Sequence, residues 1–321
     1  MKTCLYTYAL ILVAVQLHAS DPVKGLINDE KTNVLQFCKT FAPAYVPLLQ
    51  THYSSPNSWA RLVDGKPSSI AFNSNIHSDL YREFETIIHE STHKKNSEEV
   101  LFVCPENAFY TTADERTLIN QLFKSEKIGL LLPTDVQERV FRFKTYVGLY
   151  SGVTSNQNGI WGLLDEYTAY QNGCRASIMA YDNALLKGDT TMALTCIEES
   201  VKTYFAYYEF RLFIGAYLKY AALYHPDLYN NILAFTTLRK AFTLNTILFE
   251  TNLYNIKNTK QRLKRHHAHI EWLYNYYQDK YATPTQAYMQ PFQEYLSTFS
   301  KPFESEYEWA KPQHNMAFKL R

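Results

Sequence analysis

Hydrophobic residues recur at intervals of three or four positions along most of this chain, which is the spacing of a helix that buries one face. The first such series runs from residue 29 to about residue 53. It contains Pro43 and Pro47, so we expect it to form two helices with a break between them. Another series begins at Ile76, directly after Asn73-Ser74-Asn75, a segment suited to cap a helix N-terminus.

The second half of the chain keeps this helical spacing almost throughout. Half of the ten glycines fall between residues 148 and 173, so we expect a glycine-rich loop at residues 151–159. The expected helices, in order, cover residues 134 to about 150, about 160 to 186, 190–224, and two or three segments between 227 and 298.

Strand character is confined to two stretches. Residues 59–72 include the turn Asp64-Gly65-Lys66-Pro67, and residues 100–111 are divided by Pro105. Ten glycines in 321 residues disfavour a turn-rich all-β fold. We therefore predict a mainly α fold of the α+β class, in which a small, mostly antiparallel sheet lies beside the helix that begins at Ile76 and a large helical region follows.

Residues 1–20 have the organisation of a secretory signal peptide. Met1-Lys2 is a short positive region, residues 5–15 are apolar, and Ala19 and Ser20 are small residues suited to cleavage. An apolar run of about a dozen residues is short for a bilayer span, which needs about 20. We expect this segment to be removed and the mature chain to be secreted or periplasmic, without a transmembrane segment. A retained N-terminal anchor is the alternative.

The cysteines are consistent with an oxidising compartment. Cys38, Cys104, Cys174 and Cys196 follow the expected signal peptide, and their even number suggests two disulfides. Their spacing does not choose among the three ways of pairing them. It also lacks a CxxC pair, which makes a thiolate zinc site a poor interpretation. Four free, buried thiols are the alternative.

The charge balance argues against partners that are recruited by a net charge. The chain has 32 basic and 31 acidic residues, and one of the basic residues is Lys2 in the expected signal peptide. The remainder is neutral overall, so no net field recruits nucleic acid or an anionic membrane. With 46% hydrophobic and 20% charged residues, the composition is that of a globular protein and not of a disordered chain.

The segment His89-Glu90-Ser91-Thr92-His93 carries the candidate chemistry, because it places H-E-x-x-H on a predicted helix. Residues four apart on a helix share a face, so both imidazoles can reach one zinc ion at about 2.0–2.1 Å. Glu90 follows the first histidine and is suited to accept a proton from a zinc-activated water. The alternative is a surface helix with two solvated histidines.

At this motif the sequence resembles the zincin metallopeptidases. In the gluzincin pattern the third zinc ligand is a glutamate on a later helix, and Glu166 is the best match here. It lies in the apolar helical segment 162–170, directly after the glycine-rich loop. A buried carboxylate without a partner is costly, so we expect an ion or a salt bridge to compensate it. The alternative is a carboxylate favoured by the dipole at a helix N-terminus.

The metzincin pattern offers a different third ligand. It would place a glycine seven residues and a histidine ten residues after His89, and this chain has Asn96 and Glu99 at those positions. Glu99 can approach the histidines only if the helix ends near Asn96 and turns sharply. The Glu99 alternative therefore implies a different architecture from the Glu166 one, which we favour.

Other positions depart from the gluzincin pattern. Gluzincins often carry an aspartate four residues after the ligand glutamate, and this chain has Tyr170 there. Asp165 and Glu85 are candidates to orient a zinc histidine in its place. A zinc peptidase also needs a donor for the developing oxyanion, and Tyr150 and Tyr170 are our candidates.

The resemblance implies a zinc-dependent metallopeptidase that cleaves a peptide or protein substrate, and the expected signal peptide implies that it is secreted. Zn²⁺ would be held by His89, His93 and Glu166, with Glu90 as general base. Residues 21–187 would form the catalytic domain. Residues 188–321 would form a helical region, either separate or continuous with it.

Two alternatives of other classes remain open. One is a non-catalytic secreted binding protein in which HExxH is a structural or degenerate metal site. The other is a carbohydrate-binding surface protein that uses its many tyrosines. The dense aromatic series between Tyr204 and Phe213 fits such a platform, although helix packing explains it better.

Overall fold

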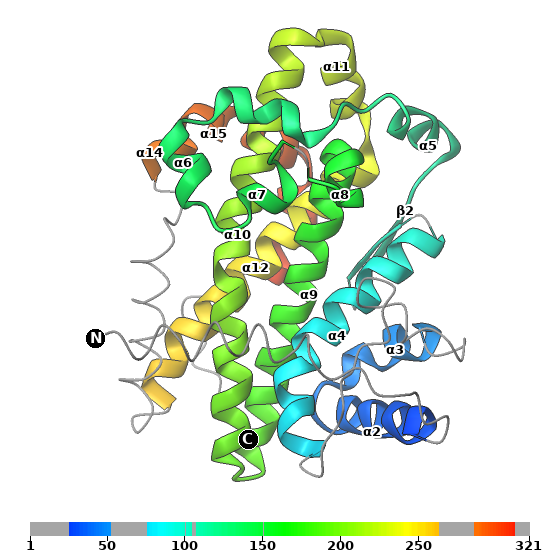
Figure 1. The fold of residues 1–321 in the computed structure, drawn as a ribbon, viewed down its shortest axis with the longest axis vertical. Helices are drawn as coiled ribbons and strands as arrows, with labels where there is room; N and C mark the ends of the chain where they lie inside the picture. The colour runs from blue at the N-terminus through cyan, green and yellow to red at the C-terminus, as the bar shows by residue number, and fades with distance from the viewer. Residues whose placement is uncertain are drawn as a thin grey trace.

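A computed structural model describes residues 26–52, 76–99, 101–104, 107–149, 151–262 and 286–311, and the features below concern these residues. Helices dominate them, as the sequence predicts. In Figure 1 the N-terminal helices lie on one side of three long helices, and most of the short helices gather towards one end. The expected signal peptide, the expected strand region at 59–72 and Tyr150 lie outside the described residues.

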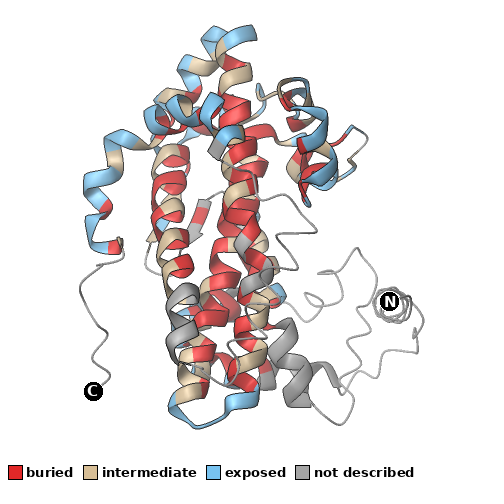
Figure 2. Ribbon diagram, turned by 90° about the vertical axis from the view of Figure 1, so that its left-hand side faces the viewer, coloured by how far each residue is buried: buried red, intermediate tan, exposed pale blue. Residues whose placement is uncertain are grey.

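Four long helices form the body of the molecule. They are α4 (Ile76–Glu99), α9 (Gly159–Leu186), α10 (Thr190–Tyr224) and α12 (Thr236–Arg262). Helix α9 contacts each of the other three, and it is buried along most of its length (Figure 2). A helix that is apolar on nearly all sides must be enclosed by others. The expected break at residues 187–189 separates α9 from α10, and the aromatic series of α10 is buried at Phe205, Tyr207, Phe210 and Phe213.

The first helical series is broken where its prolines predict. Helix α2 (Leu26–Phe41) ends before a short 3₁₀ turn, η1 (Pro43–Tyr45), and α3 (Val46–His52) follows. Pro43 stands at the first position of the turn, where its missing N–H has no helical acceptor to lose. Helix α3 packs against α4 and α2 packs against α9, and Val34, Leu49 and Phe84 are fully buried in this region.

A two-stranded antiparallel hairpin follows α4. Strand β1 (Leu101–Cys104) pairs with β2 (Asn107–Tyr110), so that Leu101 lies opposite Tyr110. Phe102 is fully buried and its ring lies 4.4 Å from that of Trp161 on α9. The strands predicted on either side of Pro105 are confirmed. Within the described residues this hairpin is the only sheet, and β1 contacts both α4 and α9.

Short helices connect the hairpin to α9. They are α5 (Ala113–Ile119), η3 (Ser125–Leu131), α6 (Thr134–Arg139), α7 (Phe143–Tyr146) and α8 (Thr154–Gln157). The prediction of one continuous helix from residue 134 to about 150 is wrong, because Val140 has an extended backbone. This break turns Arg142 inward, where its guanidinium lies 2.7 Å from the Glu209 carboxylate of α10. Both side chains of this ion pair are buried.

The remaining helices complete a large hydrophobic core, and the last of them adds a small separate cluster of Leu244, Ile247, Leu248, Tyr307 and Ala310. These helices are α11 (Pro226–Ala234), α14 (Gln286–Met289), η4 (Gln290–Phe292), α15 (Gln293–Ser300) and η5 (Lys301–Ala310). The core runs from Val34 in α2 to Phe299 in α15, so the helices before and after residue 187 share it.

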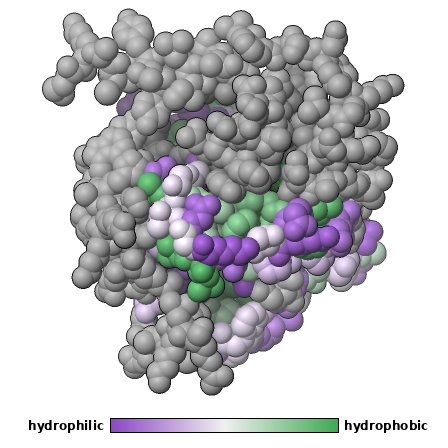
Figure 3. Space-filling view, turned by 90° about the horizontal axis from the view of Figure 1, so that it is seen from below, coloured by the Kyte–Doolittle hydropathy of each residue, from purple (hydrophilic) through white to green (hydrophobic). Residues whose placement is uncertain are grey.

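No helix among the described residues has the length and apolarity needed to cross a membrane. Seen from below, the described surface carries hydrophilic and hydrophobic side chains next to one another (Figure 3). Single exposed apolar residues such as Leu130 and Leu149 are usual on a protein surface.

The prediction of two disulfides is wrong for the cysteines whose side chains the structure describes. Cys38, Cys174 and Cys196 are free and buried, which agrees with the alternative of buried thiols. Each lies inside the helical packing, and the Cys38 Sγ donates to the carbonyl oxygen of Ala42 at 3.2 Å. Burial raises the pKa of all three thiols to about 12. The cysteines therefore give no support to an oxidising compartment.

We predict that these three thiols resist alkylation in the native protein and react fully once it is unfolded without a reductant. A thiol with a raised pKa holds little of the reactive thiolate near pH 8, and burial also excludes the reagent. Mass spectrometry of iodoacetamide-labelled peptides containing Cys38, Cys174 and Cys196 measures this directly. Recovery of any of these peptides as a disulfide-linked pair would contradict the prediction.

We also predict that Glu209→Leu lowers the free energy of unfolding by about 3–5 kcal/mol, because it leaves the Arg142 guanidinium buried without its counter-charge. The double variant Arg142→Met with Glu209→Leu should lose less, since no unpaired charge remains. Urea unfolding followed by circular dichroism measures both, and exposed Glu138→Leu serves as the control. A single variant as stable as the control would show that the ion pair does not matter.

Candidate metal centre

The candidate ligands come from two helices that cross at a glycine. Helix α4 carries the HExxH residues and α9 carries Glu166. At Gly173 of α9, a Cβ atom would lie 2.6 Å from Glu85 Oε1 and 3.0 Å from the Glu85 carbonyl oxygen of α4. The helices can therefore approach this closely only because residue 173 has no side chain. Glu85 is one turn from His89, and Gly173 is two turns from Glu166.

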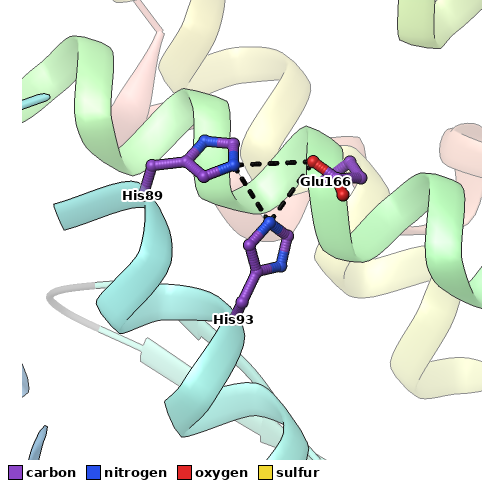
Figure 4. A group of neighbouring side chains, drawn as sticks. All are labelled: His89, His93 and Glu166. Carbon is purple, nitrogen blue, oxygen red and sulfur yellow. Dashed lines mark hydrogen bonds and ion pairs between the residues drawn. The ribbon is translucent and has the colours of Figure 1, made fainter. Parts of the chain in front are cut away.

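Three side-chain atoms converge next to this crossing (Figure 4). His93 Nε2 lies 3.0 Å from His89 Nε2, and Glu166 Oε2 lies 3.5 Å from His89 Nε2 and 3.3 Å from His93 Nε2. In a tetrahedral zinc site with ligands at about 2.0–2.1 Å, neighbouring ligand atoms lie about 3.3–3.4 Å apart. The triangle of His89, His93 and Glu166 thus has the size of one face of such a site.

The burial of these groups also fits a bound cation. Glu166 Oε2 and His89 Nδ1 are buried and have no hydrogen-bond partner among the described residues. An ion on the three converging atoms would satisfy Glu166 Oε2. Two imidazoles and one carboxylate form a donor set that suits zinc, with a fourth position left for water or substrate.

Without an ion, the charges in the cluster depend on one another. Burial raises the pKa of the Glu166 carboxyl, but the charge of His93 and the close contacts with both imidazoles outweigh burial and hold it well below its usual range. Burial lowers the pKa of His93, but Asp165 and Glu166 outweigh burial and hold it well above its usual range. A proton on His93 thus occupies the role that a metal cation would take over, since a ligating imidazole must be neutral.

His93 is oriented by a carboxylate on its other ring nitrogen. Asp165 Oδ2 lies 2.7 Å from His93 Nδ1, so Nδ1–H donates to the carboxylate and Nε2 faces the cluster. Asn96 Nδ2 donates to the second oxygen, Asp165 Oδ1, at 2.6 Å. Of the two candidates named from the sequence, Asp165 therefore makes this contact.

Glu166 is oriented by Ser155 of α8. Ser155 Oγ donates to Glu166 Oε1 at 2.5 Å, which leaves Oε2 directed towards the two histidines. Helix α8 can lie this close to α9 because of Gly162, where a Cβ atom would be 2.1 Å from the Ser155 carbonyl oxygen. Asn156 Nδ2 further ties α8 to the Tyr146 carbonyl oxygen at 3.1 Å.

Glu90 lies beside the cluster without joining it. Its Oε1 is 4.0 Å from His89 Nε2, and its side chain is 34% exposed, compared with 8% for Glu166. Burial raises the pKa of the Glu90 carboxyl, and the neighbouring carboxylates of Glu166 and Asp165 add to this while the two histidines oppose it. A carboxylate that is partly solvated and next to the ligands is suited to exchange protons with water.

Of the two candidate tyrosines, the structure describes Tyr170 but not Tyr150. The Tyr170 ring packs against the His89 imidazole, with ring centroids 4.4 Å apart, and its hydroxyl lies 3.2 Å from that of Tyr146. The Arg142 guanidinium lies 4.3 Å from the Tyr170 ring centroid. Tyr150 falls outside the described residues, so its place relative to the cluster stays a prediction.

The architecture that would favour Glu99 is not present. Helix α4 continues to Glu99, whereas the Glu99 alternative requires it to end near Asn96. Ten residues of continuous helix carry the backbone about 15 Å along the axis from His89. Asn96 is buried and bonded to Asp165 instead of forming a turn.

Sequence patterns do not indicate the roles of Asn96, Ser155 and Arg142. Asn96 and Arg142 act on residues more than 60 positions away, Ser155 acts on a residue in the next helix, and none of the three belongs to a recognised motif. The one available signal is a run of polar or small residues beside the ligands, in Lys95-Asn96-Ser97 and in Thr154-Ser155-Asn156. Such runs are common in loops and at helix ends, so they do not single out these contacts.

Comparisons of the chain with known protein families, with curated proteins and with solved structures find no match.

Proposed function

We propose that this protein is a zinc-dependent hydrolase of the gluzincin type that cleaves peptide bonds. The observation that carries the proposal is the convergence of His89 Nε2, His93 Nε2 and Glu166 Oε2, with Glu90 directly beside them. Three protein ligands with one open position are typical of catalytic zinc, whereas structural zinc sites usually have four. The choice of a peptide substrate rests on the resemblance to zincins, and export rests on the pattern of residues 1–20 alone.

Each residue has a distinct part in the proposed reaction. A zinc ion held by His89, His93 and Glu166 would supply positive charge that acidifies a water molecule and polarises the substrate carbonyl. Glu90 accepts a proton from the attacking water and delivers it to the leaving amine nitrogen. Asp165 holds His93 in the tautomer whose Nε2 is free to ligate, and Ser155 holds Glu166 with Oε2 directed to the same point.

Partial solvent access favours catalysis over a closed structural site. The side chains of His93 and Asp165 are 21% and 22% exposed, and Glu90 is more exposed than either. Water can therefore reach the region next to the ligands. A non-catalytic protein with a closed metal site would instead hide all of these groups.

We predict that His93→Ala removes both stoichiometric zinc and peptidase activity, whereas Glu90→Gln keeps the zinc and loses turnover. The first change removes a ligand, and the second removes the general base but leaves the ligands in place. Inductively coupled plasma mass spectrometry measures the zinc content, and a library of quenched fluorescent peptides measures the activity. Exposed His225→Ala and Glu138→Gln are the matched controls. Stoichiometric zinc in a His89→Ala, His93→Ala double variant would rule out the site.

We predict that Glu166→Ala weakens zinc binding by more than about 100-fold. Loss of a residue that only hydrogen-bonds to a metal ligand typically weakens binding by about 10–100-fold, and Glu166 is proposed to be a ligand itself. Glu99→Ala should change the affinity by less than about tenfold, or 1.4 kcal/mol, because Glu99 lies at the far end of α4. Titration with zinc against a competing chelator compares the two, with thermal unfolding as a check on folding. The reverse ranking would exclude the gluzincin assignment.

A further inference from the structure

The three candidate ligands are not held in the same way. His93 has Asp165 on its Nδ1, and Glu166 has Ser155 on its Oε1. His89 differs from both, because its Nδ1 is buried and has no hydrogen-bond partner among the described residues. A ligating histidine usually donates its other N–H to a carboxylate, a carbonyl or water, and this fixes the ring. Something else must set the orientation of the His89 imidazole.

The Tyr170 ring is in direct contact with this imidazole. The two rings meet edge to face, with centroids 4.4 Å apart and planes inclined at 71°. Tyr170 lies four residues after Glu166 on α9, so both side chains share the helix face that meets α4. Such a contact restricts rotation of the imidazole about its Cβ–Cγ bond and keeps Nε2 facing Glu166 Oε2.

Tyr170 is itself fixed by groups behind it. The guanidinium carbon of Arg142 lies 4.3 Å from its ring centroid, and the Phe210 ring lies 5.5 Å from it. Its hydroxyl is 3.2 Å from the Tyr146 hydroxyl. Arg142 is held in turn by Glu209 at 2.7 Å. The ring is thus supported by α7, α10 and the turn before α7, and it can act as a rigid wall for His89.

We infer that Tyr170 is the positioning residue for His89, and that it acts through its aromatic ring and not through its hydroxyl. This inference rests on the proposed metal centre. It gives Tyr170 a task different from that of an oxyanion donor, which would act through the hydroxyl. In this arrangement a hydrogen bond orients His93, whereas an aromatic contact orients His89.

The test compares two changes at one position in the full chain. Tyr170→Phe keeps the ring and the edge-to-face contact, so zinc affinity should stay within about threefold of the wild type. Tyr170→Leu removes the ring and should weaken zinc binding by about 10–100-fold, which is the usual effect of losing a residue that orients a metal ligand. Tyr220→Leu, a half-buried tyrosine that packs on Phe123 instead, is the control and should behave as the wild type.

A spectroscopic readout separates orientation from general stability. In the Co²⁺-substituted protein, the visible absorption bands report ligand geometry, and they should change in Tyr170→Leu but not in Tyr170→Phe. Equal loss of affinity in both variants would assign the effect to the hydroxyl and overturn the inference. Unchanged affinity and bands in Tyr170→Leu would overturn it as well.

A measurement without metal keeps the inference independent of the proposed function. The ring current of Tyr170 should shift the His89 ring protons in the nuclear magnetic resonance spectrum of the metal-free wild type. The shift should persist in Tyr170→Phe. An unshifted His89 resonance in the wild type would overturn the inference even if Tyr170→Leu fails to fold. Absence of zinc binding by the wild type would instead refute the metal centre, while the shift would still test the Tyr170 contact.

Discussion

Helices α4 and α9 lie close enough for polar side chains of one to reach those of the other because Gly173 has no Cβ atom beside Glu85. Every contact of the candidate site is made across this interface or next to it. His89, His93 and Asn96 extend from α4, while Asp165, Glu166 and Tyr170 extend from α9. If the helices were separated by the width of a larger side chain, the distances of 2.6–3.5 Å that join these groups would be lost.

The positive charge of Arg142, next to the site, is compensated by Glu209 and not by the carboxylates of the site. A positive guanidinium near a cation site would oppose metal binding through Coulomb repulsion. Arg142 supports Tyr170 at 4.3 Å, but its charge is compensated by Glu209 at 2.7 Å. The protein therefore gains a rigid support for the aromatic ring without adding a net positive charge. The negative groups Asp165, Glu166 and Glu90 remain to attract a cation.

The candidate ligand cluster was predictable from the sequence because each of its parts has a local signature. His89 and His93 are four residues apart on a helix, and Glu166 is a carboxylate within an apolar helical segment. The structure brings these three together, and it also confirms the hairpin around Pro105 and the broken first helix. Residues that act only through distant partners were not predictable. The break at Val140 accompanies the pairing of Arg142 with Glu209, 67 residues away, a contact that the local helical pattern does not reveal. Likewise, an even number of cysteines does not reveal that three of them lie in separate parts of the packed core.

The arrangement on α9 has a consequence for how the chain can vary. Asp165, Glu166, Tyr170 and Gly173 share one uninterrupted helix, with the two carboxylates adjacent in sequence. Inserting or deleting a single residue between Glu166 and Gly173 would rotate the carboxylates by about 100° relative to the helix crossing. Such a change would direct both of them away from α4, although the composition of the helix would hardly differ. The spacing of these four residues on α9 is therefore fixed by the contacts that they make with α4. The register H-E-x-x-H-x-x-N followed later by D-E-x-x-x-Y-x-x-G is thus a fingerprint by which other chains with this centre can be found.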